Sequence, residues 1–124
     1  MILFDTSVWL RYLRGEEPYE SHARELLTRD SVLSHDLVYG ELLIGNRGSR
    51  TALLADLRQI PSAPTVAHRE MVGFVQDRRL LAQGLSWIDA HVLAATLLVH
   101  ARVWTADEAL QRAATALGIA YQPA

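Results

Sequence analysis

Short apolar segments that alternate with longer amphipathic ones are the feature that most constrains how these 124 residues can fold. Runs such as 1–4 (MILF) and 101–104 (ARVW) fit buried strands, and the segments between them repeat apolar residues at helical spacing. Strands that alternate with helices imply right-handed crossovers and a parallel sheet with helices on both faces. We therefore predict an α/β fold with a mainly parallel sheet of four to five strands, formed by one domain over residues 1–124.

Turn and capping residues divide the chain into predicted elements. Asp5, Thr6 and Ser7 are typical N-cap residues and follow the first strand directly. The helix that they begin ends at Gly15 and Pro18. The later predictions are a helix from 19, a strand at 31–34, helices at 35–46 and 51–59, a loop at 61–64 that could include a short strand, a helix at 66–83, a helix from 86, a strand at 101–104, a last helix closed by Gly118, and a strand at 119–121.

The composition excludes several classes of protein. The chain has no cysteine, so disulfides and thiolate metal sites are excluded. The longest apolar run, 92–99, is far shorter than the roughly 20 residues of a membrane span. The N-terminus lacks the basic and apolar regions of a signal peptide. We therefore expect a cytoplasmic protein without a membrane segment. All twelve basic residues are arginine, which also excludes chemistry that requires a lysine.

Four acidic residues occur where a parallel sheet would place a ligand. Asp5 follows the first strand, and Asp107 follows the strand at 101–104. Glu41 and Asp89 are each the only acid in a long apolar segment of predicted helix. Ligands of such sheets bind outside the carboxyl ends of the strands. We therefore expect these four carboxylates to converge at one edge of the sheet.

Each acid also has a purely structural interpretation. Ser86 with Asp89 is typical of a capping box. Thr105 with Glu108 has the same spacing, which would place the intervening aspartate in the first turn of a helix. Glu41 could occupy an exposed position of an amphipathic helix, although its mostly apolar neighbours leave little polar face. At this point the structural and functional interpretations both stay open.

A cluster of carboxylates would need protons or a cation. Two carboxylates 4 Å apart repel by about 4 kcal/mol at an effective dielectric constant of roughly 20. Oxygen ligands without cysteine suit Mg²⁺ or Mn²⁺ better than zinc or copper. An ion of this kind with open coordination positions suits phosphoryl-transfer chemistry.

Two other acid-based α/β families do not fit this sequence. Response-regulator receiver domains and haloacid-dehalogenase-type phosphatases both use a lysine, and the chain has none. The phosphatases also need a second aspartate in a D-x-D motif, and Ser7 stands at that position.

Four sequence blocks together identify a more specific pattern, and the sequence resembles the PIN-domain family through them. Within that family it is most similar to the VapC toxins of bacterial toxin–antitoxin pairs. The blocks agree with the family in order and spacing and extend over nearly the whole chain. They are MILFDTSVWL, VYGELLIGNRG, GLSWIDAHVLAATLL and VWTADEAL.

The resemblance implies a single PIN domain with Mg²⁺-dependent endoribonuclease activity, in which Mn²⁺ can replace Mg²⁺. It also implies RNA products with a 5′-phosphate and a 3′-hydroxyl, a VapB-type antitoxin, a homodimer, and inhibition of growth when the toxin is free. The family often has a basic residue where this chain has Ala106, which puts an RNA contact there in doubt. The four acids of the family fall on Asp5, Glu41, Asp89 and Asp107, the metal ligands among them on Asp5, Asp89 and Asp107, and its small hydroxylated residues on Thr6 and Thr105.

The remaining candidate residues are interpreted first as structural. The tryptophans are expected in the core, although Trp9, near Asp5, could stack a base. A lone histidine beside apolar residues is more often structural than catalytic, and an arginine on a helix is more often solvated than bound to RNA. These residues are Trp9, Trp87 and Trp104; His35, His91 and His100; and Arg11, Arg14, Arg47, Arg50, Arg78 and Arg79.

Two other functions stay open beside a toxin ribonuclease. A partner-binding module could keep the fold without the chemistry, but the four intact acids argue against it. A nuclease that acts on structured DNA would need additional elements to hold a duplex, and the chain is short for them.

Overall fold

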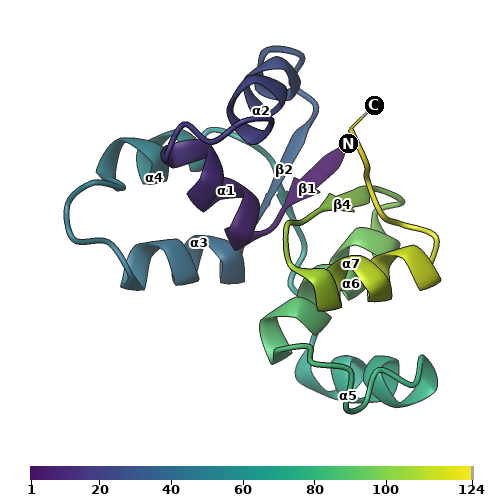
Figure 1. The fold of residues 1–124 in the computed structure, drawn as a ribbon. Coiled ribbons are helices and arrows are strands. Elements are labelled where there is room, and N and C mark those ends of the chain that lie inside the picture. Colours follow the sequence, from purple (N-terminus) through teal and green to yellow (C-terminus); the bar gives the residue numbers. More distant parts are fainter. Residues whose placement is uncertain (124) are drawn as a thin grey trace.

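The computed structural model describes residues 1–123 and places four short strands in one parallel sheet of order β3-β2-β1-β4 (Figure 1). The strands are β1 (Ile2–Phe4), β2 (Val32–His35), β3 (Ser62–Ala63) and β4 (Arg102–Trp104). Central strand β1 pairs with both neighbours, since Ile2 lies opposite Val32 on one side and Arg102 on the other. The strand predicted at 119–121 is reduced to a single parallel bridge between Val103 and Ala120.

Helices cover both faces of this sheet, as the alternation of elements predicts. In Figure 1, α1 to α4 lie on one side of the sheet and α5 to α7 on the other. The α/β prediction is therefore confirmed. The helices are α1 (Thr6–Leu13), α2 (Tyr19–Thr28), α3 (Asp36–Ile44), α4 (Thr51–Leu57), α5 (His68–Asp77), α6 (Trp87–Leu98) and α7 (Glu108–Ala116).

The core is built around β1, β4 and the most apolar helix, α6. Every residue of β1 is buried, and so are residues 90–96 of α6. The ring of Phe4 lies 4.8 Å from that of Trp9 and 5.0 Å from that of Trp104, measured between centroids. Trp9 is only 1% exposed, so it belongs to the core and the prediction that it could stack a base is wrong.

Helix α5 is shorter than the helix predicted at 66–83. It ends at Asp77. Two residues later, Arg79 adopts a left-handed conformation with φ +55°. The amide of Leu80 then donates to the carbonyl of Val75, and that of Arg79 donates to the carbonyl of Gln76. This is a Schellman ending, which is usually marked by glycine. An arginine in that position gives no sequence signal, which explains the error.

The topology of the sheet predicts where a ligand would bind. From β1 the chain passes outward to β2 and β3 along one side, and it returns to β4 on the other side of β1. The gap between β1 and β4 is therefore the point at which the winding reverses, and ligands of such folds bind at the strand carboxyl ends there. Helices α1 and α7 both begin at this edge. Within residues 1–123, no helix is long and apolar enough to cross a membrane.

Candidate active site

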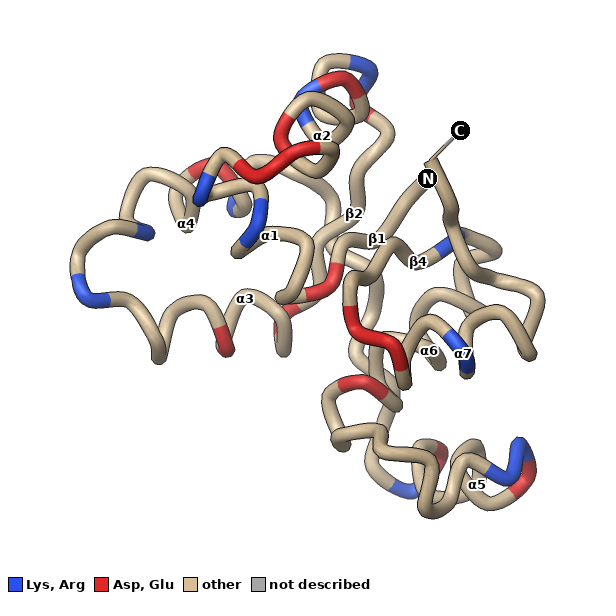
Figure 2. The backbone as a smooth tube through the Cα atoms, viewed as in Figure 1, with Lys and Arg blue, Asp and Glu red and all other residues tan. Residues whose placement is uncertain are grey.

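The four acidic residues predicted from the sequence line one pocket, of about 170 Å³, at this edge of the sheet. Each belongs to a different helix: Asp5 is the N-cap of α1, Glu41 lies within α3, Asp89 is in the first turn of α6, and Asp107 is the N-cap of α7. Figure 2 shows acidic positions in red at the end of β1 and at the start of α7. Residues more than 100 positions apart in the chain therefore share one site.

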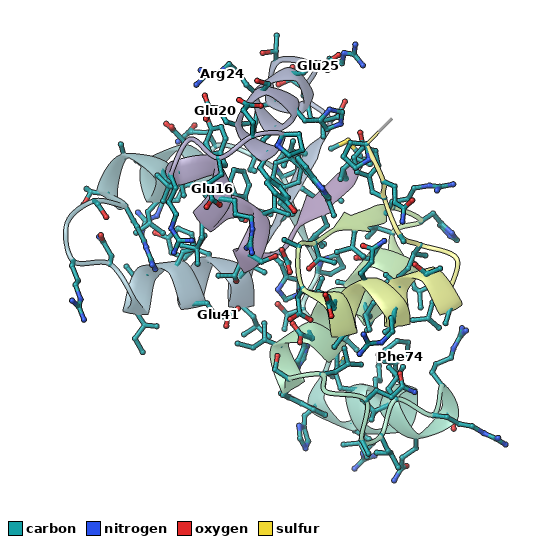
Figure 3. All side chains as sticks on the ribbon, in the orientation of Figure 1. Glu16, Glu20, Arg24, Glu25, Glu41 and Phe74 are labelled. Atoms are coloured by element: carbon teal, nitrogen blue, oxygen red, sulfur yellow. The ribbon has the colours of Figure 1, made fainter. Side chains whose placement is uncertain are left out.

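The pocket acids form no ion pairs, whereas some acids elsewhere in the described residues do. On α2, Glu20 pairs with Arg24 and Glu25 with Arg29, remote from the pocket (Figure 3). Within the described residues 1–123, no arginine forms an ion pair with any of the four pocket carboxylates. The apolar wall between them is formed by Val38, Ile88 and Val92. The pocket thus presents negative charge that the protein itself does not neutralise.

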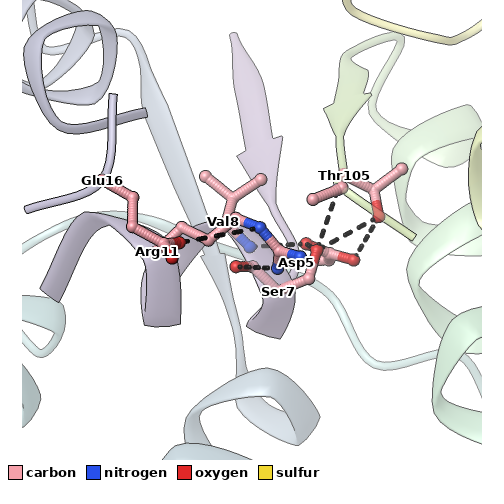
Figure 4. Close-up of polar contacts among 7 residues, drawn as sticks. Asp5, Ser7, Val8, Arg11, Glu16 and Thr105 are labelled. Carbon is pink, nitrogen blue, oxygen red and sulfur yellow. Dashed lines mark hydrogen bonds and ion pairs between the residues drawn. The ribbon is translucent and has the colours of Figure 1, made fainter. Parts of the chain in front are cut away.

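Asp5 is the most buried of the four, with 6% of its surface exposed. Its Oδ1 accepts hydrogen bonds from the Ser7 hydroxyl at 2.6 Å and from the Val8 amide at 3.0 Å. Its Oδ2 accepts from the hydroxyl of Thr105 (Figure 4). Burial raises the pKa of Asp5 above its ordinary value, against the opposing effect of these hydrogen bonds. Repulsion from Asp89 raises this pKa further, but it is the smallest contribution.

Asp107, and not Thr105, is the N-cap of α7. Its Oδ2 accepts from the Leu110 amide at 2.9 Å. The predicted Thr105–Glu108 capping box is therefore wrong. The hydroxyl of Thr105 donates to Asp5 instead, and its oxygen accepts from the Asp107 amide at 3.0 Å. The Thr105 hydroxyl thus donates to the N-cap of α1, a hundred residues away, and does not cap α7.

Asp89 forms the capping box that its spacing predicts. The Ser86 hydroxyl accepts from the Asp89 amide at 3.0 Å, and the Asp89 carboxylate accepts from the Ser86 amide at 3.0 Å. The side chain is half-buried at the pocket wall. Its structural and functional interpretations are therefore compatible.

Glu41 is exposed, in contrast to the expectation from its apolar neighbours. Those neighbours do not all face the core, since Ile44 is 90% exposed. The Thr6 hydroxyl donates to Glu41 Oε1 at 2.6 Å, which joins the start of α1 to the middle of α3. Thr6 thereby holds Glu41 against the pocket.

The donor set fits a hard divalent cation in its chemistry. All four side chains offer carboxylate oxygens, which Mg²⁺ and Mn²⁺ prefer. In residues 1–123, however, no three potential ligands lie close enough together to hold an ion in their present orientations. The reason is that Asp89 and Asp107 cap helices and Glu41 accepts from Thr6. The four acids therefore surround the pocket rather than touch one another.

Ser7 is a pocket residue that the sequence reasoning missed as a site residue. Besides donating to Asp5, its Oγ accepts from the Ala106 amide at 2.9 Å. Ser7 is only two residues after Asp5, and this proximity is the signal that could have identified it. The partner at Ala106 could not be identified in this way, because it lies on a distant loop.

Two histidines, His35 and His91, are buried and do not line the pocket. The Nδ1 of His35 accepts from the Leu37 amide at 3.1 Å and so caps α3. Its ring lies 6.4 Å from that of His91, and burial lowers the pKa of both. Trp87, at the start of α6, packs on His91 and His68 but is 44% exposed, so its predicted place in the core is wrong.

Arg11, which Figure 4 labels, is bound within the fold. Arg11 donates to the carbonyl of Ser7 at 3.2 Å and lies 3.9 Å from the carboxylate of Glu16. Arg50 likewise donates to the Leu42 carbonyl at 3.0 Å, beyond the end of α3. The structural interpretation therefore fits both of these arginines.

Comparison with known proteins agrees with the resemblance drawn from the four sequence blocks. The PIN domain family matches residues 2–116. Ribonuclease VapC32 of Mycobacterium tuberculosis, found in two strains, is 39% identical over 121 residues, which cover 97% of this chain and 95% of that protein.

A solved structure agrees with the fold. The crystal structure of PAE2754 from Pyrobaculum aerophilum superposes with a TM-score of 0.60 over 90% of this chain and 83% of that one. Its sequence identity is only 14%, so this likeness concerns the fold alone. The family match and the 39% identity to VapC32 establish that the chain belongs to the PIN-domain family and, within it, to the VapC group.

Proposed function

We propose that this chain is a Mg²⁺-dependent endoribonuclease and the toxin of a VapBC-type toxin–antitoxin pair. The observation that carries the proposal is the pocket that four carboxylates, from four helices, line without a basic partner. The 39% identity to a protein named as a ribonuclease supports RNA as the substrate. The reaction is hydrolysis of an RNA phosphodiester bond, and Mn²⁺ can substitute for Mg²⁺.

Each pocket residue has a role in this proposal. Asp5, Asp89 and Asp107 would hold the cation directly or through water. Glu41 completes the ligand set or orients the attacking water. Thr6 orients Glu41, to which it donates at 2.6 Å. Thr105 fixes Asp5 through its hydroxyl.

The proposed products, which come from the resemblance to the family, are consistent with in-line hydrolysis. When bound, the cation would activate water for attack on phosphorus and stabilise the departing oxygen. The water oxygen bonds to phosphorus, and the bond from phosphorus to the 3′-oxygen breaks. The water loses one proton, and the departing 3′-oxygen gains one. The fragments then carry a 5′-phosphate and a 3′-hydroxyl.

The proposed partners follow from the charge of the pocket and from the family. A free ribonuclease is hazardous to the cell that makes it, so we propose a VapB-type antitoxin that covers the pocket. A basic side chain of that antitoxin would supply the positive charge that the four carboxylates lack. A homodimer in the cytoplasm is proposed from the family alone.

Incubation with total cellular RNA tests the proposal directly. In Mg²⁺ the purified protein is expected to cut RNA at defined positions, and excess EDTA is expected to stop cleavage, because the carboxylates act through a cation. Mapping of the cut ends should give 5′-phosphates and 3′-hydroxyls. Cleavage that persists in EDTA, or cut ends with a 2′,3′-cyclic phosphate, would contradict the proposed chemistry.

Expression in a heterologous bacterium tests the toxin role. The unaltered chain is expected to arrest growth, and the Asp89→Asn variant is expected to relieve the arrest, because it removes a proposed metal ligand while the amide oxygen can still cap α6. Growth curves with matched soluble expression give the measurement. Normal growth despite abundant soluble unaltered protein would argue against a toxin.

A further inference from the structure

The hydroxyl of Ser7 lies where the two halves of the sheet meet at the pocket. It donates to Asp5 Oδ1 at 2.6 Å (Figure 4). It also accepts from the Ala106 amide at 2.9 Å. We propose that Ser7 is a positioning residue, which fixes the Asp5 carboxylate for cation binding by tying it to the turn between β4 and α7. This inference rests on the proposed function.

The direction of each hydrogen bond follows from the number of available protons. Ser7 has one hydroxyl proton, and it is used toward Asp5, so the oxygen is free to accept from Ala106. The Thr105 hydroxyl also donates its one proton to Asp5, and its oxygen accepts from the Asp107 amide. The Ser7 and Thr105 oxygens, 3.4 Å apart, therefore have no proton left to share with each other.

These contacts form two parallel relays that end on the same carboxylate. In each relay, an amide of the β4–α7 turn donates to a hydroxyl, and that hydroxyl donates to Asp5. Hydrogen bonds arranged in this way polarise one another. Since the two hydroxyls reach different carboxylate oxygens, they fix both the position and the rotation of the group.

These hydrogen bonds leave one acceptor position of the Asp5 carboxylate free. A carboxylate offers about four acceptor positions. The Val8 amide and Ser7 use two on Oδ1, and Thr105 uses one on Oδ2. Without the Ser7 hydroxyl, Oδ1 keeps only the Val8 amide and the Ala106 amide loses its acceptor. The carboxylate could then rotate, and the turn that carries Asp107 would be released.

A structural role in the core does not explain Ser7. Its side chain is half-buried at the pocket wall and is not part of the apolar core. Removal of its single oxygen leaves α1 with its N-cap, because the Val8 amide still donates to Asp5. We therefore expect Ser7→Ala to fold.

The test measures cation affinity and local protection in the same protein. Calorimetric titration of the metal-free chain with Mn²⁺ is expected to show about 10- to 100-fold weaker binding for Ser7→Ala, the usual effect of removing a group that orients a metal ligand. Hydrogen exchange followed by NMR should show faster exchange of the Ala106 amide, with the amides of α6 unchanged. Ser7→Thr keeps the hydroxyl and is expected to restore both measurements to within a few-fold.

Ser21→Ala is the matched control. Ser21 also donates its hydroxyl to a nearby carboxylate, that of Glu17, at 2.7 Å, but on exposed α2. It should alter neither measurement. Equal Mn²⁺ affinity of Ser7→Ala and the unaltered chain would overturn the inference, as would a Ser7→Thr variant as weak as Ser7→Ala. If the unaltered chain itself shows no saturable Mn²⁺ binding, the proposed function fails and the inference fails with it.

Discussion

The Asp5→Asn variant is expected to lose more than about a hundredfold of its RNA cleavage while it stays folded. Loss of a group that only orients a metal ligand typically costs 10- to 100-fold, and loss of a ligand itself costs more. Asp5 is at the centre of the site, since it accepts from Ser7, Val8 and Thr105. Cleavage rates on one RNA in Mg²⁺ give the measurement.

Stability separates this loss of function from loss of fold. Burial raises the pKa of Asp5 above its ordinary value of 3.8, so the folded chain binds this proton more tightly than the unfolded chain. The stabilisation from the protonated form is complete below that ordinary value and is lost as the pH rises through the raised pKa of the folded state. Above that raised pKa, the ionised carboxylate therefore costs stability.

A neutral asparagine removes this cost, and its amide oxygen can still accept from the Val8 amide. The free energy of unfolding of metal-free Asp5→Asn at pH 7 is therefore expected to equal or exceed that of the unaltered chain, as measured by urea denaturation and circular dichroism. An inactive variant that proves to be unfolded would count against Asp5 as a site residue.

Addition of Mn²⁺ or Mg²⁺ is expected to raise the melting temperature by several degrees. A ligand that binds only the folded state at a hundredfold excess over its Kd stabilises that state by about 2.7 kcal/mol. In a domain of this size such a free energy corresponds to a shift of several degrees. Mn²⁺ should give at least as large a shift as Mg²⁺, because it stands higher in the affinity order of divalent ions.

Two matched variants test whether the ion binds in the pocket. Asp89→Asn should reduce the shift, because it removes a carboxylate from the pocket. Asp30→Asn should not, since Asp30 lies in the turn before β2 and does not line the pocket. Its backbone has φ +53°, which asparagine tolerates as well as aspartate does. Equal shifts in both variants would mean that the ion binds diffusely.

The sequence alone predicts the architecture and the meeting of the acids because both depend on regular patterns. Alternating strands and helices specify a parallel sheet, and such a sheet brings its carboxyl ends to one edge. Asp5 and Asp107 follow two adjacent strands, β1 and β4, so their arrival in one pocket follows directly. The capping box of Ser86 and Asp89 is equally local and is confirmed.

The details that the sequence does not reveal depend on contacts between distant residues. Thr105 is spaced to cap α7 but donates to Asp5, because folding brings that buried carboxylate within reach. Trp87 has the composition of a core residue, yet its place at the start of α6 leaves it at the surface. Ser7 looks like a local partner of Asp5, and only the folded chain reveals its bond to Ala106.

The bonds that join the first strand to the turn after β4 also bear on the synthesis of the protein. Asp5 leaves the ribosome early, but the Thr105 hydroxyl and the Ala106 amide, which complete its surroundings, are translated about a hundred residues later. Strand β4, which lies beside β1, is also among the last elements to be made. A nascent chain therefore cannot assemble the pocket until nearly all of it has emerged. Under the proposed function, a polypeptide that is still being translated therefore cannot yet cleave RNA.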